Sequence, residues 1–361
     1  METAPPLVSV IMPCFNAGPM LRPALLSVFE QSHPNIEIIF VDNNSTDGSA
    51  DAATELARAH ARSLRVVTCE VQGTNHARNA GYALAHGQYI QWMDADDRLD
   101  RDKVALQVAA LQRHPEDDIA YGDWTVHRTE PGNGHSERRK NLHQVDDQLG
   151  RTLAGIWYPP HLYLLRREAA ERLQDVQAWW PERKVATDIE YSALAALLGL
   201  RFRYAPGAHV QYNIWSTSQI SGSTAYLDRL AALESIFRRL REFVRAGRAK
   251  VSLDEGHRLL LNQSWDALVL PRGSAVLVEL PGGGIRLRQT SGGKEIALAP
   301  HEVTIAKAIA ALSRPLSAPH IAVWLMEAVP ALEENPVPVF AAIERLRREG
   351  FLRRTGGEPT K

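Results

Sequence analysis

The first quarter of the chain alternates between strand-like and helix-like hydrophobic patterns, and this alternation limits the possible folds more than any other feature. The expected strands are 7–12, 36–41, 64–68 and 88–93, and the expected helices are 19–32, 50–61 and 73–86. Strands that alternate with helices in this way indicate βαβ units and a parallel sheet. Each strand runs into a polar loop, so we expect these loops to meet at one edge of the sheet and to form the functional site there.

Three carboxylates, those of Asp94, Asp96 and Asp97, follow directly after the last of these strands. Oxygen ligands at the carboxyl edge of a parallel sheet suit Mg²⁺ or Mn²⁺ bridging a diphosphate. The alternative is that they form an acidic N-cap for a helix beginning near Asp100. Three bare carboxylates this close together repel one another, so a cation is part of the prediction.

Composition narrows the class of protein. The 361 residues are 45% hydrophobic, which is enough to bury two cores. A formal net charge of −1 gives no electrostatic case for nucleic acid or an anionic membrane as partner. Cys14 and Cys69 are the only cysteines, which indicates a reducing compartment. The first residues lack a signal-peptide pattern and no stretch is apolar for long enough to span a bilayer, so we expect a soluble cytoplasmic protein without a transmembrane segment.

The middle of the chain is less regular. A strand is expected at 117–128, followed at 130–140 by a charged, glycine-containing loop with the character of a mobile flap. A helix over 188–198 ends at Gly199, a typical C-cap, and a further strand is expected at 201–204.

The last hundred residues change character. They contain three strand patterns followed by three helix patterns, at 275–279, 284–289, 295–298, 301–312, 318–329 and 337–350. Strands packed with a three-helix unit of this length look like a winged helix, a fold used for DNA, protein and peptide recognition alike. We therefore expect a large α/β domain over 1–224, a helical linker over 225–270 and a small α+β winged-helix-like domain over 271–361.

Five short motifs, in order and with fitting spacing, give the chain a family resemblance. They are VSVIMPCFN at 8–16, FVDNNSTDGS at 40–49, ARNAG at 77–81, GQYI at 87–90 and DADD at 94–97. Residues 7 to about 220 thereby resemble the family 2 glycosyltransferases. The resemblance implies the GT-A fold, a Rossmann-like mixed sheet, and transfer of a sugar, of hexosyltransferase type, from a nucleotide-diphosphate donor with inversion at the anomeric carbon.

The first two motifs would bind the nucleotide. A uracil-type base needs a fixed acceptor and backbone partners at the ends of the first two strands, and Pro13, Phe15, Asn16, Asp42 and Asn43 are placed to supply them. The family more often has a second Asp where this chain has Asn43. A UDP-sugar is favoured, but this departure leaves dTDP or another nucleotide open. In the alternative interpretation, the asparagine pair only forms a turn that caps the next helix.

The resemblance also suggests roles for charged residues. Arg78 would reach the diphosphate as a bidentate donor, unless it forms a surface salt bridge instead. Asp96 would hold the Mn²⁺ or Mg²⁺ that stabilises charge on the leaving diphosphate. Asp94 would face the ribose or a metal-bound water. Asp97 would orient the acceptor or cap the next helix.

Inversion requires a base, which the family places at the start of a later helix. Here the matching stretch is 186–190, ATDIE, so Asp188 falls on the base position and Thr187 replaces the usual glutamate. Glu190, two residues on, points to another helix face but remains a candidate pocket residue. The alternative for Asp188 is a helix N-terminal acid stabilised by the dipole.

Residues 211–221 fall where many relatives have a Tyr-Arg-x-His loop that closes over the diphosphate. This chain has Asn213 and Trp215 at the Arg and His positions, so the usual imidazole is absent. His209 is nearby but shifted, and we expect it at a strand end. We predict no metal ligand in this loop. Trp215 either stacks on a sugar or packs in the core.

Several functions remain open at this stage. The acceptor is either a peptide, or a glycan or glycolipid of the cell surface. The tail loosely resembles the peptide-recognition domain found beside enzymes that modify ribosomally made peptides, in which an extended leader adds to a strand edge. A less favoured alternative is a winged-helix DNA-binding regulator with a degenerate sugar-nucleotide domain. Its support is a basic set at the C-terminus, formed by Arg345, Arg347, Arg348, Arg353 and Arg354.

Overall fold

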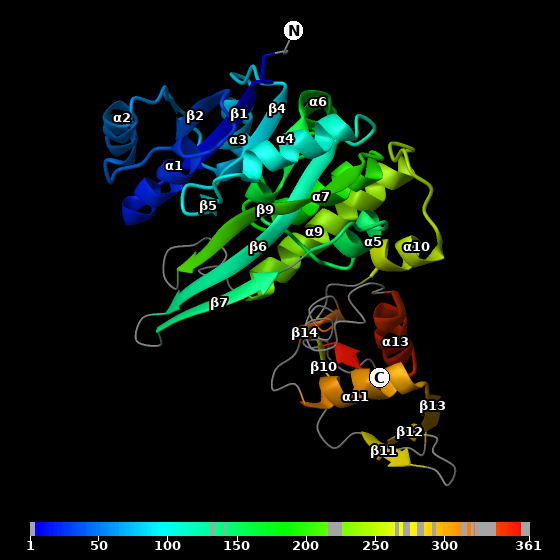
Figure 1. Ribbon diagram of the computed structural model, residues 1–361. Helices are drawn as coiled ribbons and strands as arrows, with labels where there is room; N and C mark the ends of the chain where they lie inside the picture. The colour runs from blue at the N-terminus through cyan, green and yellow to red at the C-terminus, as the bar shows by residue number, and fades with distance from the viewer. Residues whose placement is uncertain are drawn as a thin grey trace. The chain divides into compact units, whose positions relative to one another are not determined.

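The computed structural model divides the chain into two compact units, which are described separately (Figure 1). Unit 1 comprises residues 1–148 and 158–225, and unit 2 comprises residues 149–157 and 226–361. The residues that the structure describes are 4–130, 134–140, 142–215, 226–263, 267–269, 275–279, 285–290, 294–311, 316–318, 321 and 337–354.

Unit 1 is built on a nine-stranded mixed sheet in the order β3-β2-β1-β4-β8-β6-β9-β5, with β7 pairing β6. Its strands are β1 Val8–Cys14, β2 Ile36–Asp42, β3 Arg65–Thr68, β4 Tyr89–Trp92, β5 Arg98–Leu99, β6 Ile119–Glu130, β7 Gly134–Lys140, β8 Leu164–Arg166 and β9 Phe202–Trp215. The first four strands pair in parallel, as the alternating sequence pattern predicts. Antiparallel β8 then joins β4 to β6. The mixed sheet confirms the predicted α/β fold class.

Helices connect these strands, and those expected at 19–32, 50–61, 73–86 and 188–198 lie close to their predicted positions. They are η1 Gly18–Met20, α1 Leu21–Phe29, α2 Ser49–Ala59, α3 Thr74–Tyr82, α4 Lys103–Arg113, η2 Pro160–Leu162, α6 Arg167–Asp175 and α7 Thr187–Leu197. Every residue of β1 is buried because the strand lies between β2 and β4. Gly81 brings α3 against this strand, since a Cβ there would lie 2.5 Å from Cγ2 of Ile11 and 2.9 Å from Cγ2 of Val41. This contact explains the glycine of the ARNAG motif.

Two expectations for the middle of the chain are wrong. The charged stretch at 130–140 is no loop in its described part, because residues 134–140 form β7 and pair antiparallel with β6. The strand expected at 201–204 continues to Trp215, because it pairs in parallel with β6 along its whole length (Figure 1). His209 therefore lies inside β9 and not at a strand end. These strands contain many charged and polar residues, so hydrophobic periodicity does not predict them.

Unit 2 contains two small sheets and several helices. The helices are α5 Gln148–Leu153, which begins at the last residue of unit 1, α9 Tyr226–Arg245, α10 Glu255–Leu261, α11 Pro300–Ala311 and α13 Val337–Arg348. One sheet is β11 Ala275–Glu279, β12 Ile285–Gln289 and β13 Glu295–Leu298, and the other is β10 Ala267–Val269, β14 Leu316–Ser317 and β15 Arg353–Arg354.

The three strands predicted in the tail are confirmed as one antiparallel sheet, β11-β12-β13. The helices expected at 301–312 and 337–350 match α11 and α13. Most of the helix expected at 318–329 lies outside the described residues, so the winged-helix assignment stays a prediction. Within the described part of the chain, no helix is both long enough and apolar enough to span a membrane.

Candidate active site

The loops after β1 and β2 are tied together by polar contacts at the predicted edge of the sheet. Asn16 donates its backbone N–H to Oγ of Ser45 at 3.1 Å, and its Oδ1 accepts from the backbone N of Thr46 at 2.7 Å. Asn16 has φ 50°, a left-handed conformation that asparagine tolerates better than most residues. The neighbouring Phe15 is 53% exposed, so an aromatic face is available beside these loops. Pro13 lies inside β1.

Asn43 is a buried residue whose side-chain amide is engaged on both sides. Its Nδ2 donates to the carbonyls of Cys69 and Val71 at 2.7 and 2.8 Å, and its Oδ1 accepts from the backbone N of Gly73 at 2.7 Å. The amide therefore holds the loop between β3 and α3 to the end of β2. A carboxylate has no hydrogen to donate to the two carbonyls, which gives a physical reason for asparagine here.

Asp42, at the end of β2, is buried, and its Oδ1 accepts from the backbone N of Ser45 at 3.3 Å.

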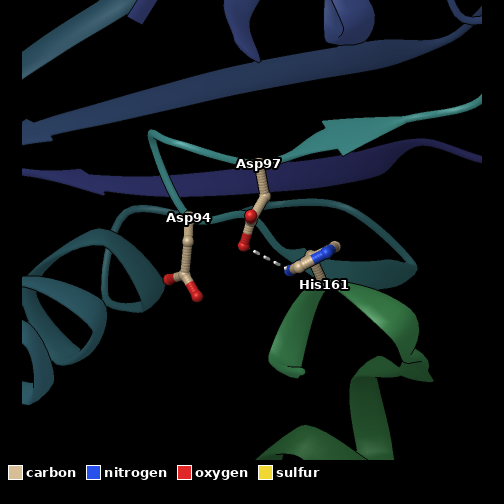
Figure 2. A group of neighbouring side chains, drawn as sticks. All are labelled: Asp94, Asp97 and His161. Carbon is tan, nitrogen blue, oxygen red and sulfur yellow. Dashed lines mark ion pairs between the residues drawn. The ribbon is translucent and has the colours of Figure 1, made fainter. Parts of the chain in front are cut away.

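The loop after β4 carries Asp94, Asp96 and Asp97, which we call the metal loop (residues 94–97). Asp94 Oδ1 lies 2.7 Å from NH2 of Arg78 in an ion pair. Asp97 is 1% exposed, and its Oδ2 lies 3.2 Å from Nδ1 of the fully buried His161 (Figure 2). Asp96 is partly exposed. Two of the three carboxylates thus face basic side chains of the protein itself.

Burial disfavours charge on both Asp97 and His161. Burial, followed by the charges of Asp96 and Asp94, raises the pKa of Asp97 well above its usual range. Burial lowers the pKa of His161, although the nearby carboxylate of Asp94 pulls in the opposite direction. Both shifts favour the uncharged forms of the two side chains.

Arg78 joins the metal loop to the helix that carries the predicted base. Besides Asp94, its NH1 donates to Oγ1 of Thr187 and to Oδ1 of Asn75, both at 3.4 Å. The guanidinium carbon lies 4.2 Å from the ring centroid of Trp179, in a cation–π contact. Arg78 is 4% exposed, so it is no surface salt bridge. Its predicted contact with a diphosphate stays a prediction.

Asp188 is the second residue of α7 and lies in its first turn; its role as the base stays a prediction. Burial raises the pKa of Asp188 from 3.8 to about 6, although nearby backbone groups and Arg78 lower it. The preceding Ala186 has φ 56°, an uncommon left-handed conformation for a residue with a Cβ. Glu190 is fully buried and faces inward to Arg183, with Nε and Oε2 3.0 Å apart. The structure thus gives Glu190 a structural partner.

The partly buried phenol of Tyr212 lies near the acids that were predicted from separate parts of the sequence. Burial raises the pKa of Tyr212, and so do the charges of four surrounding carboxylates, those of Asp97, Asp188, Asp96 and Asp94. Tyr212 lies on β9, next to Asn213. Trp215 ends the same strand, but its side chain lies outside the described part of the structure.

His161 and Asn213 were missed as site residues by sequence reasoning. Asn213 donates its backbone N–H to Oδ1 of Asp97 at 2.7 Å and its Nδ2 to the carbonyl of Asp96 at 2.8 Å. His161 stands in an aromatic stretch that resembles ordinary core sequence. The available signal was a histidine between a proline and a leucine, which is too common to assign a role.

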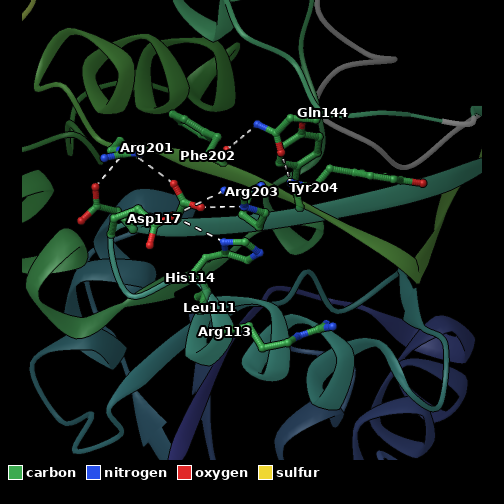
Figure 3. Close-up of polar contacts among 12 residues, drawn as sticks. Leu111, Arg113, His114, Asp117, Gln144, Arg201, Phe202, Arg203 and Tyr204 are labelled. Atoms are coloured by element: carbon green, nitrogen blue, oxygen red, sulfur yellow. Dashed lines mark hydrogen bonds and ion pairs between the residues drawn. The ribbon is translucent and has the colours of Figure 1, made fainter.

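A second group of potential metal ligands lies elsewhere and is occupied by arginines. His114, Glu116 and Asp117 approach one another at the start of β6. Asp117 Oδ2 accepts from Nε of Arg203 at 2.6 Å, and its Oδ1 lies 3.5 Å from Nε of Arg201 (Figure 3). These guanidinium groups already balance the acids, so the group is an ion-pair network that joins the starts of β6 and β9.

The mixed sheet, with acids after β4 and in the first turn of α7, is consistent with the GT-A fold. Residues 9–174 match the model of glycosyl transferase family 2. Unit 1 therefore contains a segment that is similar to the family 2 glycosyltransferases. This agrees with the resemblance seen in the motifs.

Relatives of known sequence or structure support this class. An uncharacterized glycosyltransferase of Haemophilus influenzae is 39% identical over 110 residues, covering 30% of this chain and 44% of that protein. A PGL/p-HBAD biosynthesis glycosyltransferase of Mycobacterium bovis is 32% identical over 127 residues, covering 35% and 50%. The chain thus spans half the length or less of these relatives. The S. aureus TarS 1–349 structure with UDP-GlcNAc shares the fold at TM-score 0.52 and 20% identity, covering 70% of each chain.

Proposed function

We propose that the chain is a metal-dependent inverting glycosyltransferase that moves a sugar from a nucleotide-diphosphate donor to an acceptor nucleophile. The observation that supports this most directly is the gathering of Asp94, Asp96, Asp97 and Asp188 around Tyr212. One of these acids, Asp188, has a pKa of about 6, which suits a general base near neutral pH.

The donor set fits a divalent cation. Asp96 lies in the loop after β4, is partly exposed and offers a carboxylate oxygen of the type that Mg²⁺ and Mn²⁺ prefer. Asp96 is therefore the proposed ligand. When bound, the cation would supply positive charge for the leaving diphosphate. Asp94, fixed by Arg78, would face the ribose or a bound water.

Residues of the chain itself would accept the proton and bind the nucleotide. Asp188 would accept the proton of the acceptor hydroxyl as that oxygen attacks the anomeric carbon. The nearby charge of Arg78 helps to keep the Asp188 carboxylate ionised, so that it is ready to accept this proton. The loops of Phe15, Asn16 and Asp42 would bind the nucleotide, while Asn43 would hold the neighbouring loop in place.

Two classes of acceptor are proposed, a peptide and a glycan or glycolipid. A peptide delivered by unit 2 fits the antiparallel sheet β11-β12-β13, since an extended segment can add to a sheet edge. A glycan or glycolipid acceptor is the other candidate, supported by the M. bovis relative whose name refers to PGL/p-HBAD biosynthesis. Both acceptors use the same donor site, so the test of that site does not depend on the choice.

Calorimetry on the full chain tests the donor site. UDP, dTDP and GDP are each titrated into the protein, once in the presence of Mn²⁺ and once in the presence of a chelator. UDP is expected to bind most tightly, and only when Mn²⁺ is present. Asp96→Ala is expected to abolish this metal-dependent binding. The matched control is Asp102→Ala, which removes an exposed carboxylate just before α4. Equal binding in chelator, or unchanged binding by Asp96→Ala, would contradict the proposal.

A further inference from the structure

His161 is buried between three elements of the sheet region although no motif marks it. It lies in η2 and is fully buried, with its ring stacked against Tyr212 at a centroid distance of 6.3 Å and an angle of 16°. Its carbonyl accepts from Nε2 of Gln91 on β4 at 2.9 Å, and Oε1 of Gln91 accepts in turn from the buried Nζ of Lys103. The position of this imidazole is therefore set by β4, α4 and β9 together.

The imidazole approaches the metal loop at Asp97. Nδ1 of His161 lies 3.2 Å from Oδ2 of Asp97, and the opposite oxygen, Oδ1, accepts from the backbone N of Asn213 at 2.7 Å. Asn213 then donates its side-chain amide to the carbonyl of Asp96 at 2.8 Å. Asn213 of β9 is thus bonded both to the side chain of Asp97 and to the backbone carbonyl of Asp96.

We propose that His161 is a positioning residue that fixes the metal loop, and with it the Asp96 carboxylate, by clamping Asp97 between its imidazole and the backbone of Asn213. This inference rests on the proposed function of Asp96 as the metal ligand. His161 itself touches neither metal nor donor in this scheme.

Charge explains why the loop needs such a clamp. Three acids within four residues push one another apart, and the repulsion is strongest where water is excluded. Arg78 pairs with Asp94 at 2.7 Å, and the imidazole of His161 lies 3.2 Å from the carboxyl group of Asp97. Without the imidazole, Asp97 would be a buried acid lacking its partner, and it would have to turn toward water and carry Asp96 with it.

The magnitude follows from other metal sites. Replacing a residue that orients a metal ligand through a hydrogen bond commonly weakens metal affinity or activity by about 10–100-fold. We expect His161→Ala to weaken Mn²⁺ binding in the presence of UDP within this range. His161→Gln, which keeps a polar side chain facing Asp97, is expected to recover part of the loss. Asn213→Ala removes only the bond to the Asp96 carbonyl and is expected to cost about 3–10-fold.

The matched control is His33→Ala. His33 is also a buried histidine of unit 1, and its Nε2 lies 2.8 Å from the carbonyl of Pro6, at the beginning of the sheet. This variant loses a buried imidazole and one hydrogen bond without touching the metal loop. It is expected to lower Tm while leaving the Mn²⁺ affinity within twofold of wild type, so general destabilisation is separated from positioning.

Two measurements on the full-length protein test the proposal. Free Mn²⁺ is followed by electron paramagnetic resonance during titration with and without UDP. Hydrogen exchange of the amides at 94–98 is measured by mass spectrometry without any metal, where His161→Gln and Asn213→Ala should speed exchange at least tenfold and His33→Ala should not. Should His161→Ala fail to fold, the other two variants still give both measurements.

The outcomes distinguish the two proposals. If wild type binds UDP equally well without Mn²⁺, the proposed metal function of Asp96 fails, and the exchange measurement alone decides whether His161 clamps the loop. If wild type needs Mn²⁺ but His161→Gln and Asn213→Ala match His33→Ala in both affinity and exchange, the positioning role is overturned while the proposed function stands.

Discussion

Arg78 lies 2.7 Å from Oδ1 of Asp94 and 3.4 Å from Oγ1 of Thr187, so a single guanidinium joins the metal loop to the helix that begins beside Asp188. The ring of Trp179 covers the guanidinium and restricts its movement. A change in the position of Arg78 would therefore disturb the donor side and the base side of the site together.

The first prediction concerns the ion pair between Arg78 and Asp94. In a double-mutant cycle of Arg78→Gln and Asp94→Asn, the free energies of unfolding should show a coupling of about 1–3 kcal/mol, because the Arg78 side chain is 5% exposed and the pair is little screened by water. Denaturant unfolding of the four proteins provides the measurement. Additive effects within about 0.3 kcal/mol would show that the two side chains do not stabilise each other.

The second prediction separates Asp188 from Glu190. Asp188→Asn is expected to keep its affinity for the donor and to lose transfer by about 10²-fold or more, the scale of losing a general base. Glu190→Gln is expected to lower Tm and to keep most of kcat, because Glu190 is buried against Arg183. Initial rates and thermal unfolding are measured for both. An inactive Glu190→Gln with an active Asp188→Asn would move the base by two residues.

The third prediction is a pH profile. The base must be ionised to accept a proton, and burial raises the pKa of Asp188 to about 6. We therefore expect kcat/KM to fall about tenfold for each pH unit below 6 and to level off above it. Glu190→Gln should keep this profile. A profile that stays flat down to pH 4.5 would exclude Asp188 as the base.

The fourth prediction follows from the same pKa but concerns stability. The folded state holds the Asp188 proton more tightly than the unfolded state, whose pKa stays near 3.8. This contribution is fully present below the unfolded pKa and is lost as pH rises toward about 6. At pH 7.5 the buried charge costs about 1–3 kcal/mol, so Asp188→Asn should raise Tm there.

The stability gain of Asp188→Asn should disappear at pH 4, where the wild-type acid becomes protonated. Asp175→Asn, which neutralises an exposed carboxylate on α6, is the control and should leave Tm nearly unchanged at both pH values. An equal gain at pH 4 and pH 7.5 would show that the effect does not come from ionisation. A variant that is more stable but inactive is typical of a functional site that holds unfavourable charge.

Much of the fold of unit 1 was predictable because its signals are local. Each of the first four strands is a short apolar run between turn residues, and each pairs with a neighbour in the order that βαβ connections favour. The length of β9 and the hairpin of β6 and β7 were not predictable. Their stability comes from pairing with a partner strand that is distant in sequence, which periodicity does not report.

The candidate site also contains residues with local signals and residues without them. Asp94, Asp96 and Asp188 stand in motifs or at a helix start, so the sequence was sufficient to select them as candidates. The partner of Asp97 could not be found, because His161 approaches it only after β4, η2 and β9 have come together. Asn43 was expected to face a base, whereas the structure shows its amide engaged with Cys69, Val71 and Gly73. A motif identifies a residue type but not its hydrogen-bond partners.

The basic set at the C-terminus bears on the DNA-binding alternative. Arg345 makes two hydrogen bonds to the Glu302 carboxylate, at 2.8 and 2.7 Å, and a third to the carbonyl of Ala297 at 3.0 Å. Arg347 is likewise paired with Glu344 at 2.6 Å. These guanidinium groups already have carboxylate partners within unit 2. An amphipathic helix with a solvated basic side describes α13 better than a DNA-reading helix does.

The last prediction compares Arg345 with Arg348, which have the same charge and lie on the same helix. Glu302 is buried, so Arg345→Ala leaves its carboxylate without the guanidinium and should destabilise unit 2 by about 1–2 kcal/mol, whereas exposed Arg348→Ala should change it little. Calorimetry measures the stability, and fluorescence anisotropy with duplex DNA measures binding. We expect no binding above the weak, salt-sensitive level of any protein. Tight DNA binding that Arg348→Ala weakens while Tm stays constant would instead favour a regulator.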